Sequence, residues 1–78
     1  MKRILIINPN SSEAMTRTIQ KFAKVFVGHR AEVVTALTDG APEFIETYSD
    51  ESQAMAGMTR LIKDNQEDYD GFVIACHS

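Results

Sequence analysis

The sequence contains little cysteine, proline or glycine, and it contains no tryptophan. Its 78 residues include one cysteine, two prolines and four glycines. A single cysteine excludes an internal disulfide bond, and one cysteine with two separate histidines provides no cluster for zinc. The low proline and glycine contents, with 44% hydrophobic residues, exclude collagen-like and disordered chains. We therefore expect one small domain without a metal, in a reducing, cytoplasmic setting.

The chain also has no clustered charge of one sign and no long apolar run. The net charge is −3 and the Lys and Arg residues are scattered, which argues against nucleic acid or an anionic membrane as a partner. The longest apolar run near the start, Ile4 to Ile7, is far too short to span a bilayer. Pro9 and Asn10 end this run too early for the apolar core of a signal peptide.

The apolar residues that are present alternate between strand-like and helix-like patterns. Segments rich in apolar and β-branched residues at 4–7, 31–37 and 72–75 predict three strands. Two stripes at helical spacing predict an amphipathic helix between each pair of strands. The first stripe consists of Met15, Ile19, Phe22 and Phe26, and the second of Met55, Met58, Leu61 and Ile62. Gly28 is expected to end the first helix.

Polar residues before each stripe are the expected helix N-caps. Asn10 with Glu13 three residues later fits a capping box for the first helix, and Ser11 or Ser12 are the alternatives. For the second helix we expect Ser49 or Asp50 as the cap.

The order of these elements, β-α-β-α-β, predicts an α/β fold. Right-handed crossovers make this a parallel, flavodoxin-like sheet of order 2-1-3. We interpret residues 1–78 as a single, partial α/β domain, because flavodoxin-like sheets usually continue beyond a third strand. The third strand is then an open edge, so we expect a homo-oligomer or pairing with another chain through this strand.

Two polar segments follow strands that should be neighbours in this sheet. Residues 8–12 (Asn-Pro-Asn-Ser-Ser) follow the first strand, and Cys76, His77 and Ser78 follow the third. Open α/β sheets bind ligands beyond the carboxyl ends of their strands. The adjacent helix N-terminus favours an anion and also a thiolate. From these patterns alone, Cys76 remains either a reactive thiol or a small, inert core residue.

Several known chemistries of such sheets are excluded by position. A phosphoreceiver domain needs acidic residues after the first strand and an aspartate after the third, where Asn8 and Cys76 stand. The glycine-rich signatures of a P-loop and of a dinucleotide site are both missing after the first strand. Thioredoxin-like chemistry needs a second cysteine. The candidate site that remains is the single thiol of Cys76 opposite the loop of residues 8–12, which is rich in amides and hydroxyls.

Three segments together resemble the aspartate/glutamate/hydantoin racemase superfamily, and in particular its hydantoin and allantoin racemase branch. They are Ile6 to Ser11, Pro42 to Glu46 followed by Asp50 and Glu51, and Val73 to Cys76. The resemblance extends over the whole chain. Each segment alone is a weak signal, whereas all three in this order are fairly specific.

The resemblance implies a cofactor-independent racemase with two facing α/β domains, each of which supplies one cysteine. One thiolate removes the proton from the chiral carbon of a small-molecule substrate, and the opposite thiol returns a proton to the other face. By position, Cys76 matches the first of these cysteines. The residues that match substrate-binding positions are Asn8, Asn10, Ser11, Ser12, His77 and Ser78. The substrate implied is a hydantoin, a ureide such as allantoin, or an amino-acid-like compound.

The chain departs from the family pattern in two ways. Ala41 precedes Pro42, where the hydantoin branch usually has glycine. The second cysteine and the second domain are also absent from these 78 residues. We therefore interpret the chain as the N-terminal part of a racemase and expect it to be inactive alone. The alternatives are a non-catalytic, truncated module that pairs with another chain, or a single-cysteine decarboxylase or isomerase of the same superfamily.

Overall fold

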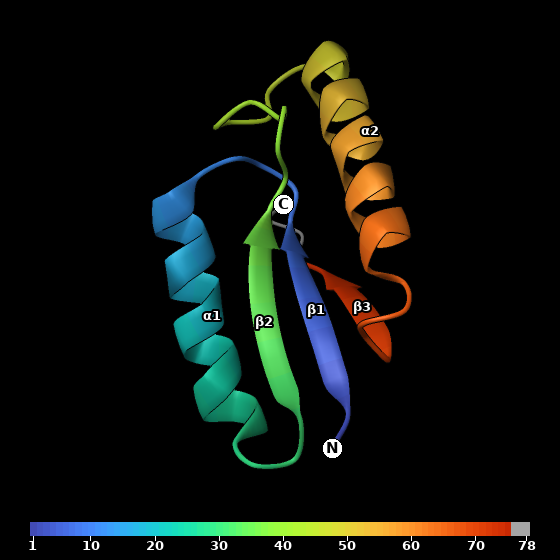
Figure 1. The fold of residues 1–78 in the computed structure, drawn as a ribbon. Coiled ribbons are helices and arrows are strands. Elements are labelled where there is room, and N and C mark those ends of the chain that lie inside the picture. The colour runs from blue at the N-terminus through green and yellow to red at the C-terminus, as the bar shows by residue number, and fades with distance from the viewer. Residues whose placement is uncertain (76–78) are drawn as a thin grey trace.

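The computed structural model describes residues 1–75 and contains a three-stranded parallel sheet with two helices. The strand order is β2-β1-β3, as predicted (Figure 1). In chain order the elements are β1 (Arg3–Asn8), α1 (Glu13–Val27), β2 (Glu32–Leu37), α2 (Tyr48–Asn65) and β3 (Gly71–Ile74). The predicted α/β fold is therefore confirmed, with each boundary within a few residues of its expected position.

The strand register brings the carboxyl ends of β1 and β3 side by side. Ile7 of β1 lies opposite Ile74 of β3 and Ala36 of β2. Beyond the last residue of β3, the amide of Ala75 donates a hydrogen bond of 2.9 Å to the carbonyl oxygen of Ile7. The polar loop after β1 therefore begins level with the end of β3, as the order 2-1-3 requires.

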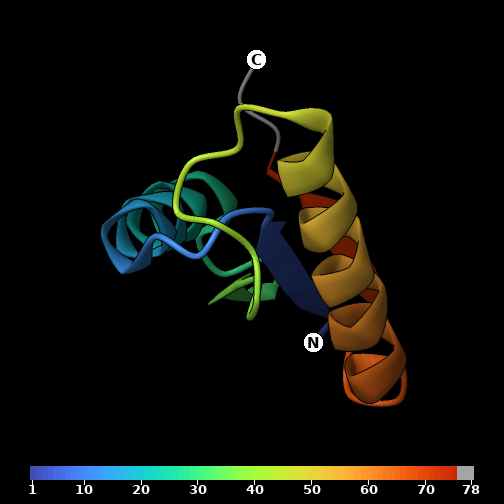
Figure 2. The ribbon, with the colours of Figure 1, turned by 90° about the horizontal axis from the view of Figure 1, so that it is seen from above.

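The two helices cover opposite faces of the sheet (Figure 2). Because strand side chains alternate between faces, Leu5 and Ile7 share one face, and they are the most buried apolar strand residues at 2% and 0% exposure. Ala54 of α2, also 2% exposed, belongs to this core. On the other face, Gln20 of α1 donates to the carbonyl oxygen of Val33 at 2.9 Å.

The N-cap of α1 is Ser12, one of the predicted alternatives. Its side-chain oxygen accepts from the amide of Met15 at 3.2 Å. The Asn10–Glu13 capping box is wrong, because Asn10 lies before the cap and its side-chain oxygen instead accepts from the amide of Ser12 at 2.9 Å. Gly28 ends the helix with a φ of 62°, as predicted.

The N-cap of α2 is Thr47, so the prediction of Ser49 or Asp50 is wrong. The amide of Asp50 donates to the Thr47 hydroxyl oxygen at 3.1 Å, and the amide of Thr47 donates back to the Asp50 carboxylate at 3.2 Å. Asp50 is thus the partner of the cap in a capping box. Hydrogen bonds from the amide of Glu46, and then from Thr47, hold the pKa of Asp50 below its ordinary value.

The two apolar stripes are only partly covered. In α2 the buried residues are Ala54 and Gly57, whereas Met55 of the predicted stripe is 64% exposed. In α1 no residue is fully buried, and Phe22 and Phe26 are 71% and 84% exposed. The helices form as expected, but the largest side chains of their stripes do not fill this core.

Candidate functional site

Asn8, the last residue of β1, is the centre of a hydrogen-bond network in the loop that follows. It is completely buried. Its side-chain nitrogen donates to the side-chain oxygens of Asn10 at 2.9 Å and Thr16 at 3.0 Å, and more weakly to the carbonyl of Ser12 at 3.4 Å. Its side-chain oxygen accepts from the amide of Asn10 at 3.3 Å. Asn8 therefore fixes the loop and presents no free polar atom.

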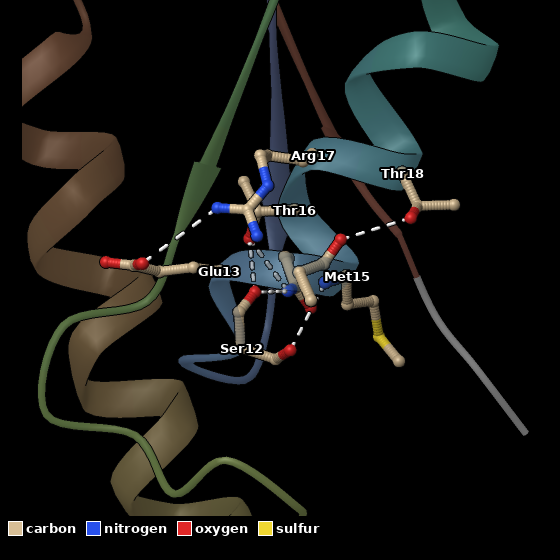
Figure 3. A network of polar contacts seen from close by, with 8 residues as sticks. Ser12, Glu13, Met15, Thr16, Arg17 and Thr18 are labelled. Atoms are coloured by element: carbon tan, nitrogen blue, oxygen red, sulfur yellow. Dashed lines mark hydrogen bonds and ion pairs between the residues drawn. The ribbon is translucent and has the colours of Figure 1, made fainter.

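Asn10 and Ser12 also use their side chains within this network. The side-chain nitrogen of Asn10 lies 3.4 Å from the sulfur of Met15, while its oxygen is shared by Asn8 and Ser12. The carbonyl of Ser12 accepts from both the amide and the hydroxyl of Thr16, at 3.1 and 2.8 Å. Figure 3 shows Ser12, Met15 and Thr16 in this first turn of α1.

Ser11 and the first turn of α1 contain the polar groups that we consider as donors to a ligand. Ser11 is partly exposed, and its amide donates to the carbonyl of Pro42 at 3.2 Å. The Ser12 hydroxyl accepts from the amide of Met15, and the Ser12 carbonyl accepts from that of Thr16. Among residues 1–75, the amides of Glu13 and Ala14 in this first turn have no hydrogen-bond partner. Such amides, at the positive end of a helix, suit an anion or a carbonyl oxygen that gains negative charge.

Thr38 completes the support of this loop, and sequence reasoning missed it. It is fully buried directly after β2. Its hydroxyl donates to the carbonyl of Asn8 at 2.7 Å, and its amide donates to the carbonyl of Asn10 at 3.1 Å. A threonine at a strand end is an unremarkable sequence feature. Only the adjacency of β1 and β2 gives it this role.

The carboxyl edge of the sheet is hollowed on both sides of Pro9 and Ile45. One hollow of about 310 Å³ is bordered by Asn10, Met15, Phe44 and Glu46 in addition to these two residues. A second hollow, also about 310 Å³, has α2 as its wall and ends at Ile74 of β3. The loop between β2 and α2 therefore lines both hollows. The sequence indicated this loop only as part of a family motif.

The predicted site residues have different outcomes. Asn8, Asn10, Ser11 and Ser12 are brought together at the carboxyl end of β1, next to Ala75. Cys76, His77 and Ser78 lie outside the described residues, so their predicted roles stay predictions.

Within residues 1–75, no three side chains of His, Cys, Asp or Glu are grouped to hold a metal ion. Neither helix in this part of the chain has the length and apolarity needed to cross a membrane.

Comparisons with known proteins agree on one family. The Asp/Glu/Hydantoin racemase model matches residues 4–78. A hydantoin racemase of Pseudomonas sp. (strain NS671) is 37% identical over 75 residues, which are 95% of this chain and 30% of that protein. An uncharacterized protein of Schizosaccharomyces pombe is 31% identical over 80 residues, covering 100% of this chain and 33% of its own length.

A solved structure shares the fold. The allantoin racemase from Klebsiella pneumoniae superposes with a TM-score of 0.88 at 36% identity, over 97% of this chain and 31% of its own. The chain thus spans about a third of the length of the relatives it matches. The resemblance inferred from the three sequence segments is confirmed. The chain belongs to the Asp/Glu/Hydantoin racemase family.

Proposed function

We propose that this chain supplies one half of a cofactor-independent racemase site for a hydantoin, an allantoin-like ureide or an amino-acid-like carbon acid. The family match and the names of two relatives support the reaction class. The observation that carries the proposal is the loop of residues 8–12. Asn8 and Thr38 fix it beside the end of β3, from which Ala75 leads directly to Cys76.

The proposed reaction is a proton transfer at the carbon next to a carbonyl group. The Cys76 thiolate takes the proton, the C–H electron pair becomes an enolate, and the carbonyl oxygen gains negative charge. The Ser11 hydroxyl and the amides of Glu13 and Ala14 are the donors proposed for this oxygen, because preorganised donors stabilise developing charge. A thiol has an ordinary pKa of about 8.5, so a modest decrease makes it a base near neutral pH.

Inversion also requires a proton donor on the opposite face of the enolate. These 78 residues contain one cysteine, so a second thiol has to come from outside them. We propose that the chain alone does not racemise its substrate and that it pairs with another chain to do so, with the open edge of β3 as one route. A reducing cytoplasm would keep the Cys76 thiol free.

A second candidate is a one-base enzyme of the same superfamily. A lone Cys76 that removes a proton and returns one from solvent to the same face exchanges hydrogen for deuterium without inversion. A decarboxylase would instead release carbon dioxide from a malonate-like acid and place the proton on the resulting carbanion. A non-catalytic module would do neither.

One experiment tests whether Cys76 transfers the proton and whether inversion needs a second thiol. Enantiopure 5-substituted hydantoin or allantoin is incubated with the chain in deuterium oxide, and NMR follows loss of the C–H signal while polarimetry follows inversion. We expect exchange faster than with the C76S variant, without loss of optical activity. Exchange equal to that with C76S would overturn the role of Cys76. Racemisation by the chain alone would overturn the need for a second thiol.

A further inference from the structure

Arg3, the first residue of β1, contacts three successive residues of the turn that leads from α2 into β3. Its guanidinium nitrogen Nη1 donates to the carbonyl oxygen of Asp68 at 2.8 Å. Its carbon Cζ lies 4.7 Å from the centre of the Tyr69 ring, a distance at which the face of an aromatic ring attracts a cation. The backbone amide of Arg3 donates to the Asp70 carboxylate at 2.7 Å. One residue at the start of the sheet therefore holds residues 68–70.

Arg3 and Asp70 bond each other in both directions, and we call them the Arg3–Asp70 pair. The amide of Asp70 donates to the carbonyl oxygen of Arg3 at 2.8 Å, while the Asp70 carboxylate accepts from the Arg3 amide. The regular pairing of β1 with β3 begins one residue later on each strand, at Ile4 and Gly71. The pair thus closes the ladder at its amino end, with a side chain in place of a strand carbonyl.

The side chain of Arg3 also reaches the start of β2. Its nitrogen Nε lies 3.5 Å from a carboxylate oxygen of Glu32, the first residue of that strand. The two side chains are 43% and 53% exposed, so this ion pair contributes little to stability by itself. The directed hydrogen bonds to Asp68 and Asp70, rather than the ion pair, therefore define where β3 begins relative to β1.

The register of β3 decides where the chain arrives at the candidate site. The strand has four residues, and just beyond it the amide of Ala75 bonds the carbonyl of Ile7. Cys76 follows directly in the sequence. A slip of one residue would move the end of the strand by about 3.3 Å and turn each of its side chains to the opposite face of the sheet. Fixing the start of β3 at Asp70 therefore also fixes the point from which the chain continues to Cys76.

We propose that Asp70, through its pair with Arg3, is a positioning residue for Cys76, an inference that rests on the proposed function of this thiol. Asp70 lies six residues before Cys76, about 20 Å along an extended strand, so it acts through the register of β3 and not by contact with the substrate. Because β3 is shorter than most strands, the two hydrogen bonds of the Arg3–Asp70 pair are a large part of what fixes this register.

Amide hydrogen exchange of the full chain, followed by NMR, tests the register. In D70A we expect the protection of the Ala75 amide to fall by about 10-fold or more relative to that of the Thr38 amide, because a hydrogen bond to a charged group is lost. The Thr38 amide is bonded beyond β2 and reports that the variant is folded. D70N keeps a side-chain oxygen for the Arg3 amide and should restore the wild-type ratio. D68A is the matched control, since it removes the same charge while Arg3 uses only the carbonyl of Asp68.

The consequence for Cys76 is tested by exchange of the substrate C–H group in deuterium oxide. D70A should slow the Cys76-dependent exchange by about 10-fold or more, because a displaced base loses its alignment with the substrate. D70N and D68A should stay within about twofold of the wild-type rate. An unchanged ratio of Ala75 to Thr38 protection in D70A would overturn the proposal, and so would a lowered ratio with wild-type substrate exchange. Wild-type exchange equal to that of C76S would instead overturn the proposed function, and the protection ratio would still decide the register.

Discussion

At the scale of single residues, Thr38 connects three parts of the molecule. Its hydroxyl and amide bond the carbonyls of Asn8 and Asn10, and its methyl group packs toward Gly57 of α2. The loop after β1 is thus held by the residue that follows β2, which itself packs against α2. This explains why a short polar loop has one defined geometry at the candidate site.

The hydroxyl of Thr38 should contribute measurably to stability. Thr38→Val keeps the shape of the side chain but leaves the buried carbonyl of Asn8 without this donor, which costs about 1–2 kcal/mol. The measurement is the free energy of unfolding in urea. Thr38→Ser, which keeps the hydroxyl, should retain the hydrogen bond. Thr59→Val serves as the exposed control, and a loss there equal to that at Thr38 would contradict the assignment.

Gly57 is required for the close approach of α2 to the loop after β2. A methyl group built on Gly57 would lie 2.8 Å from the carbonyl oxygen of Asp39 and would also collide with the methyl of Thr38. Gly57→Ala should therefore destabilise the fold by about 1–3 kcal/mol, although alanine normally favours a helix. Gly71→Ala, at a position with open space, is the control and should be neutral or slightly stabilising in the same urea titration. A more stable Gly57→Ala variant would refute this packing.

At the scale of elements, the start of α2 shows what sequence patterns determine and what they do not. The polar cluster predicted Ser49 or Asp50 as the cap, whereas the helix already begins at Tyr48. Thr47 is the cap because it is extended, with a φ of −128°, and because Asp50 lies three residues later. Several polar residues in a row offer alternative caps, and only the backbone path out of the preceding loop selects one of them.

The capping box should make the start of α2 sensitive to acid. The pKa of Asp50 is lowered by its hydrogen bonds, chiefly from Glu46, so the carboxylate stabilises the folded state above the ordinary value of 3.8. This stability is lost as the pH falls through the lowered pKa of the folded state. The amide signals of Glu46 and Thr47, followed by NMR, should titrate with a midpoint below 3.8. A midpoint at or above 3.8 would show that the box does not form, and Asp50→Asn should abolish the titration.

At the scale of the whole molecule, the chain combines a three-stranded sheet with large apolar side chains that are exposed to solvent. Leu5 and Ile7 are buried as a central strand requires. The stripe of α1 is well formed as a pattern, yet Phe26 faces solvent at 84% exposure. A pattern of this kind shows that a helix buries one side, but it does not show whether the covering surface belongs to the same 78 residues.

The sequence by itself determined the order of elements, the parallel sheet and the segments of the family motif. These features depend on local periodicity, on turn residues and on the handedness of crossovers, all of which are present in consecutive residues. The tertiary structure decided the roles within the site. The side chains of Asn8 and Asn10 hold the loop, and Thr38, directly after β2, donates to it. Such roles depend on which residues distant in sequence meet in space, and no local pattern contains that information.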